Sequence, residues 1–129
     1  MRKRRQRALR ELLDEARQNG ITIHTDEEAQ ALLDWAAQRE GAPPENYYAV
    51  TFGSDIFIRP EYAGNVRVLR EEIIHVAQQR AGVGSDQVIR AEVEARVQMI
   101  SNRHRWGLTN DEIREIIKEV RRLRRDWRY

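Results

Sequence analysis

The chain has 129 residues, no cysteine and a formal net charge of +2. This length suits one domain with one hydrophobic core, and the lack of cysteine excludes a disulfide scaffold, a thiolate zinc ribbon and a cysteine nucleophile. No apolar run approaches the roughly 20 residues that a membrane span needs, so we expect no such span.

The basic residues gather at the two ends of the chain. Residues 1–10 carry a net charge of +6 and residues 118–129 a net charge of +4, which leaves −8 for residues 11–117. Such ends could bind nucleic acid or an anionic surface. Because aromatic residues are not interleaved with most of the bases and no groove-reading motif is present, we favour two solvated helix faces and a linker remnant.

The N-terminal segment is predicted to be helical. Its apolar residues are spaced for one helical face, and Asn19-Gly20 ends the pattern; they are Leu9, Leu12, Leu13 and Ala16. We expect a basic N-terminal helix or linker remnant over residues 1–19 and a single domain over residues 20–129.

A short strand and a second helix are predicted next. Residues 21–24 alternate as a strand does, and the pair Thr25 and Glu28 forms a capping box with Thr25 as the N-cap. Gly41, followed by two prolines, ends this helix.

The strongest hairpin signal covers residues 47–58. Residues 47–52 are rich in aromatic and β-branched types, and Gly53-Ser54-Asp55 has the composition of a turn. Residues 56–58 provide the second strand, which Pro60 ends.

Three helices are predicted to follow the hairpin. The first runs from about residue 65 to 81, the second from an N-cap at Ser85 to about residue 107, and the third opens with a capping box of Thr109 and Glu112. The order of elements predicts an α+β fold that is mostly helical, with a small antiparallel hairpin packed on helices.

Residues 68–79 carry the pattern with the clearest chemistry. Four apolar residues form the expected core side of the helix, and four polar residues form the opposite side; they are Leu69, Ile73, Val76 and Ala77, and Glu71, Glu72, His75 and Gln79. The spacings i,i+4 and i,i+3 bring side chains together on one helix face. An imidazole one turn from a carboxylate supplies two ligands for a divalent metal, and a further carboxylate can act as general base towards water.

A third metal ligand is expected from the next helix. Glu92 lies beside apolar positions and Glu94 lies on a polar face, so we prefer Glu92 and keep Glu94 as the alternative. In the competing interpretation, both acids form ordinary ion pairs with Arg90 or Arg96.

The segment VLREEIIHVAQQRAG, residues 68–82, resembles the active-site helix of zincin-like metallopeptidases, in which His-Glu-x-x-His is often followed by Val-x-Gln-Gln. The resemblance implies a zincin-like core with His75 as the second metal-binding histidine, Glu72 as the catalytic base and Glu92 as the downstream ligand. Glu71 stands where the first histidine should be. It either ligates the metal as a carboxylate, or the site is weakened or lost.

Zincins hold substrate on the hairpin before this helix. The resemblance therefore makes Tyr48, Arg59 and Tyr62 candidates for substrate binding, together with Gln79 on the helix.

A wider stretch, from His24 to the segment NRHRWGLTNDEI, is similar to C-terminal toxin modules of bacterial polymorphic toxins, especially those that follow RHS repeats. That resemblance implies a toxin domain secreted as part of a larger bacterial protein. It would act in the cytoplasm of a target cell and be neutralised by a cognate immunity protein.

We expect a metal-dependent hydrolase, in first place a peptidase acting on a protein of the target cell. Zinc is the expected metal, held by Glu71, His75 and Glu92, and Glu72 activates water. One alternative is a metal-independent, nuclease-like toxin, in which Glu72 and His75 form an acid–base pair and the arginine-rich ends bind phosphate. The other is a degenerate, non-enzymatic binding module.

Overall fold

The computed structural model describes residues 2–125 and confirms an α+β fold in which helices predominate. In chain order the elements are α1 (Arg2–Gln18), β1 (Thr22–His24), α2 (Glu27–Glu40), β2 (Ala49–Phe52), β3 (Asp55–Ile58), α3 (Val66–Arg80), α4 (Val88–Ser101) and α5 (Asn110–Arg125). Residues 126–129 of the basic C-terminal segment lie outside the described part of the chain.

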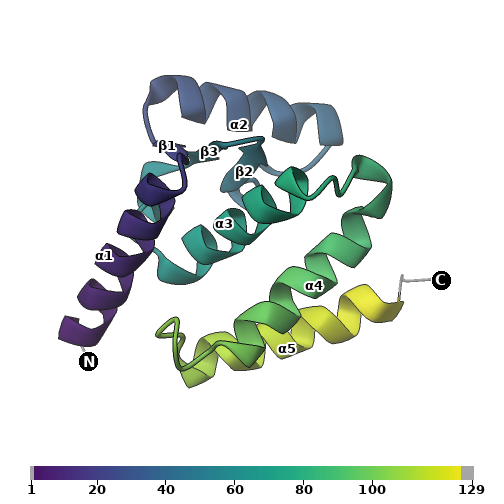
Figure 1. Ribbon diagram of the computed structural model, residues 1–129. Coiled ribbons are helices and arrows are strands. Elements are labelled where there is room, and N and C mark those ends of the chain that lie inside the picture. The colour runs from purple at the N-terminus through teal and green to yellow at the C-terminus, as the bar shows by residue number, and fades with distance from the viewer. Residues whose placement is uncertain (1, 126–129) are drawn as a thin grey trace.

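The strands form one small sheet between helices. Its order is β1-β3-β2, with β1 parallel to β3 and β2 antiparallel to β3, so the predicted hairpin is confirmed and gains a third strand. Helix α2 lies over one face of the sheet and α3 lies on the other, and α4 and α5 run side by side below α3 (Figure 1). Strand β2 therefore has one neighbour within the described sheet and is an edge strand.

Helix α3 lies at the centre of the molecule and belongs to both hydrophobic clusters. Leu69 packs with α1 and the strands, whereas Ile74 packs with Met99 of α4 and Ile116 of α5. The prediction of one core side was too simple, because the side of α3 that carries Glu71 and Glu72 is also covered. Ala77, predicted to be a core residue, is exposed.

Three predicted helix boundaries are wrong. The N-cap of α2 is Asp26 rather than Thr25, because the Asp26 carboxylate accepts a hydrogen bond of 3.0 Å from the Ala29 amide. Helix α4 begins at Val88, and the predicted start at Ser85 falls on a short 3₁₀ turn over Ser85–Gln87. The same helix ends at Ser101, and the residues up to Gly107 form turns.

The capping box of the last helix is confirmed. The Thr109 hydroxyl accepts a hydrogen bond from the Glu112 amide at 3.1 Å, and a Glu112 carboxylate oxygen accepts one from the Thr109 amide at 2.9 Å. Two of the amides that the start of α5 leaves without partners inside the helix are thereby satisfied.

Helix α1 is part of the folded core. Leu12 and Ala16 are each 1% exposed and pack in the cluster that includes Leu69. Near the start of the helix, Arg5 forms an ion pair of 2.9 Å with Glu112 of α5 and donates a hydrogen bond to the Gly107 carbonyl. The basic N-terminal helix thus docks on both α3 and the start of α5.

Replacing Leu12 by alanine should lower the free energy of unfolding by about 2 kcal/mol, because it opens a cavity in this cluster. The neighbouring Leu13 is 40% exposed, so Leu13→Ala serves as the matched control and should cost less than about 0.5 kcal/mol. Urea denaturation followed by circular dichroism measures both values. Equal costs at the two positions would contradict the docking of α1.

Candidate functional site

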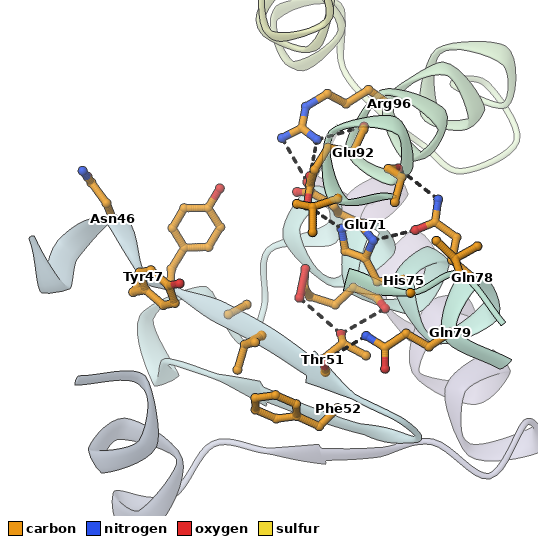
Figure 2. A pocket seen from close by; sticks show the side chains of 18 residues that line it. Asn46, Tyr47, Thr51, Phe52, Glu71, His75, Gln78, Gln79, Glu92 and Arg96 are labelled. Atoms are coloured by element: carbon orange, nitrogen blue, oxygen red, sulfur yellow. Dashed lines mark hydrogen bonds and ion pairs between the residues drawn. The ribbon is translucent and has the colours of Figure 1, made fainter. Parts of the chain in front are cut away.

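A cleft of about 750 Å³ opens between the hairpin and the helices. Strand β2 forms one wall, α3 the floor and the first half of α4 the other wall (Figure 2). The predicted active helix therefore faces a cavity, and the two elements expected to complete the site both border it.

Glu71, His75 and Glu92 converge in this cleft. Each offers one ligand atom, and these atoms all lie within 4.8 Å of one another. Glu92 Oε1 lies 3.3 Å from Nε2 of the His75 imidazole. The three residues that the sequence selected as metal ligands are thus brought together, whereas their role in metal binding stays a prediction.

Gln78 holds the His75 ring in place. Its amide nitrogen donates to the Ala91 carbonyl at 3.0 Å, so its oxygen is left to accept from His75 Nδ1 at 2.8 Å. With Nδ1 carrying a proton, the lone pair of the neutral ring is on Nε2, which faces the two carboxylates. Outer hydrogen bonds of this kind set the tautomer of metal-binding histidines.

Glu72 lies beneath the cluster, 7% exposed, between α3 and β2. The Thr51 hydroxyl lies 3.2 Å from its Oε1 and 3.3 Å from its backbone carbonyl. Burial raises the pKa of Glu72 to about 7, and the charge of His75 and the hydrogen bond from Thr51 offset this only in part. A carboxyl group with such a pKa can accept and return a proton near neutral pH.

His75 and Glu92 form a charged pair. Burial opposes protonation of His75, but the hydrogen bond to Glu92 and the charges of Glu72 and Glu92 outweigh it and raise its pKa to about 9. Burial likewise opposes ionisation of Glu92, but His75 and Arg96 lower its pKa to about 2. Without a metal, the site therefore holds an imidazolium ion next to a carboxylate at neutral pH.

Arg96 pairs with Glu92, as the competing interpretation of the sequence expected, but its bonds to Glu71 and Glu119 were not predicted. Its side chain is 10% exposed; Nη2 lies 3.1 Å from Glu71 Oε1, Nη1 lies 2.5 Å from Glu92 Oε2, and Nε lies 2.8 Å from Glu119 Oε1. Burial works against its charge, but these carboxylates outweigh it and raise the pKa of Arg96. The i,i+4 spacing from Glu92 indicated one of these bonds; the other two depend on how α4 packs against α3 and α5.

Glu94, the alternative ligand, lies outside the cluster. It is exposed and forms an ion pair of 3.3 Å with Arg90, as the competing interpretation for that residue expected.

The predicted substrate-binding residues divide into two groups. Tyr48 and Gln79 line the cleft, and Gln79 also ties α3 to the hairpin: it donates to the Thr51 carbonyl at 3.0 Å and accepts from the Gly53 amide at 2.7 Å.

Arg59 and Tyr62 are not among the described residues that line the cleft. Arg59 is buried and bonds to Asp34 and to backbone carbonyls, and Tyr62 packs against Tyr48 with ring centroids 5.0 Å apart. Direct contact of these residues with a substrate stays a prediction.

Within residues 2–125, no helix has the length and apolar character required to cross a membrane.

The model of one protein family matches residues 2–83, and that family is described as the eCIS core domain. The match includes Glu71, Glu72 and His75, whereas Glu92 and Arg96 lie beyond it. No curated protein and no solved structure matches the chain. Since the family model covers more than half of the chain, the protein belongs to the eCIS core domain family and is a module associated with extracellular contractile injection systems.

Proposed function

We propose that this module is a metal-dependent hydrolase, in first place a zinc peptidase, that acts as a toxin domain. The observation that carries the proposal is the convergence of the Glu71, His75 and Glu92 ligand atoms within 4.8 Å beside the buried Glu72. The family association with injection systems supports a role in toxin delivery. A link to RHS repeats in particular stays a prediction from the sequence.

The donor set suits a divalent metal. One imidazole and two carboxylates are ligands that zinc accepts, and the Nδ1–Gln78 bond leaves Nε2 of a neutral His75 available. Two oxygen or nitrogen atoms bound tetrahedrally to one zinc ion lie about 3.4 Å apart, so ligand atoms that are up to 4.8 Å apart must move closer to bind it. The metal must also displace the proton of His75 and compete with Arg96 for the carboxylates.

A bound divalent metal would polarise a water molecule and a substrate carbonyl. Glu72 accepts the proton from the water as the oxygen attacks the carbonyl carbon, and then delivers it to the leaving nitrogen as the C–N bond breaks. Thr51 orients the Glu72 carboxylate for this transfer. Gln78 and Glu92 fix the imidazole ring of His75.

A peptide is the substrate class that the walls of the cleft favour. Ala49 and Val50 of the edge strand β2 line the cleft, and an extended chain can add to such an edge by backbone hydrogen bonds. The described lining also contains three acidic residues and a single arginine, a charge balance that disfavours the phosphate backbone required by the nuclease-like alternative.

Zinc binding tests this proposal. The metal-free protein should bind about one zinc ion, and His75→Ala should weaken that affinity at least about a hundredfold because it removes the only nitrogen ligand of the cluster. His104, which is exposed in the turns after α4, provides the matched control His104→Ala. Isothermal titration calorimetry measures the zinc affinity of the wild-type protein and of the two variants. Equal affinity of wild type and His75→Ala would contradict the proposed site.

A second candidate, a non-enzymatic binding module, is favoured by Arg96. Its guanidinium already neutralises Glu71 and Glu92, which lets the cluster exist as a structural ion-pair network. Failure of the wild-type protein and of its Arg96 variants to bind zinc, with no cleavage of peptide or nucleic acid by the wild-type protein, would select this candidate.

If the module is a toxin domain as proposed, it is secreted as part of a larger bacterial protein and acts in the cytoplasm of a target cell. A cognate immunity protein is then its expected partner. An immunity protein that inhibits the module could cover the cleft, since the proposed chemistry depends on access to it.

A further inference from the structure

We propose that Arg96 is an internal cation that competes with the metal for Glu71 and Glu92 and so limits metal binding to this module. The inference rests on the proposed function. It follows from where the guanidinium lies: both of its Nη atoms are bonded to carboxylates that the metal would use (Figure 2).

The competition is direct because the same two carboxylates are involved. Glu71 Oε1 is bonded to Arg96 Nη2, and Glu92 Oε2 is bonded to Nη1, while Glu92 Oε1 faces His75. Both acids belong to the metal-ligand cluster. A divalent ion placed among these atoms would also lie close to the guanidinium charge in a largely buried site, where repulsion is screened weakly. Metal binding therefore requires the Nη contacts of Arg96 to loosen.

Glu119 gives the guanidinium an anion besides Glu71 and Glu92. Its Oε1 accepts from Arg96 Nε at 2.8 Å, and Arg67 of α3 bonds to the same carboxylate. Arg96 can therefore keep a charged partner on α5 while Glu71 and Glu92 turn towards a metal. The geometry makes this arginine a built-in regulator of the site, supplied by a helix outside the residues that match the family model.

The central experiment compares Arg96→Gln with Arg90→Gln. Arg90 lies on the same helix and pairs with Glu94 in an exposed i,i+4 ion pair, so its replacement is a matched control. We expect Arg96→Gln to bind zinc at least about tenfold more tightly than wild type, since a nearby positive charge is removed and two ligands are freed. Arg90→Gln should stay within about twofold of wild type, as is usual for an exposed pair. Competition with a chromophoric zinc chelator measures these affinities.

A measurement on the wild-type protein does not depend on whether Arg96→Gln folds. In protein labelled with ¹⁵N-arginine, the Nη signals of Arg96 should shift and exchange faster with water when zinc is added, while its Nε signal remains protected by Glu119. Arg90 signals serve as the internal reference. Zinc binding that leaves the Arg96 Nη signals unchanged would overturn the inference.

The outcomes separate this inference from the proposed function. If wild type binds zinc and loses it in His75→Ala, but Arg96→Gln binds no more tightly than wild type, then the role of Arg96 is wrong and the metal site stands. If neither wild type nor Arg96→Gln binds zinc, the proposed metal site and the proposed role of Arg96 are both wrong. If a folded Arg96→Gln protein binds zinc more tightly than wild type, and the double variant with His75→Ala loses that binding, the result supports both the metal site and the role of Arg96.

Discussion

Replacing Glu72 by glutamine should lower the rate of peptide hydrolysis by about a thousandfold, because the cleft then lacks the group that accepts a proton from water. Glutamine has the size of glutamic acid and can still bond to Thr51, whose hydroxyl lies 3.2 Å from Glu72 Oε1. Zinc affinity should change little, since Glu72 is outside the ligand cluster. Cleavage of a fluorescence-quenched peptide library by the zinc-loaded protein measures the rate.

Glu94→Gln is the matched control for this experiment. Glu94 is an exposed glutamate that pairs with Arg90 on the outer face of α4, so its replacement should leave the rate within about twofold of wild type. Equal rates in wild type and Glu72→Gln would contradict the assignment of Glu72 as the base. A loss of zinc from Glu72→Gln would instead place this carboxylate among the ligands.

The fold was predictable where local chemistry decides it. The hairpin follows from a Gly-containing turn between two β-branched runs, and the start of α5 follows from the Thr109–Glu112 capping box. The capping residue of α2 was misplaced by one because Thr25 and Asp26 are both good N-caps, and only the backbone geometry selects Asp26.

The site was predictable to the extent that it is built on one helix. Helical spacing places Glu71 one turn before His75, and the preference for Glu92 over Glu94 came from the apolar neighbours of Glu92. Arg96 could not be assigned in this way. Its bonds to Glu71 and Glu119 join three helices, and the angle and register of helix packing are not visible in a single sequence.

The burial of the acidic side of α3 has the same origin. The pattern of polar and apolar residues over 68–79 by itself indicates an amphipathic helix with one solvent-exposed face. In the structure, β2 and α4 cover that face. Since burial is what raises the pKa of Glu72, the chemistry of the site depends on long-range packing that the pattern of polar residues does not reveal.

The metal-free protein should lose stability as the pH rises from 6.5 to 9, and most of this loss should come from His75. The folded state raises the pKa of His75 from 6.5 to about 9, so the folded state binds the proton more tightly than the unfolded state. The resulting stabilisation is complete below pH 6.5 and disappears as the pH passes 9. Linkage relates the two pKa values to a loss of about 3 kcal/mol in the free energy of unfolding.

The comparison of wild type with His75→Gln isolates this contribution. Urea denaturation at intervals of one pH unit in the presence of EDTA should show the full decline in wild type and a smaller decline in His75→Gln between pH 6.5 and 9. The decline that remains in His75→Gln comes from Glu72, whose pKa burial raises from 4.5 to about 7. His104→Gln, which changes an exposed histidine, should retain the wild-type profile. The same decline in His75→Gln would mean that other groups cause it and that His75 does not hold its proton through Glu92. Because a metal ligand must release that proton, the total loss that wild type shows beyond His75→Gln also measures how strongly the folded cleft holds the proton that zinc must displace.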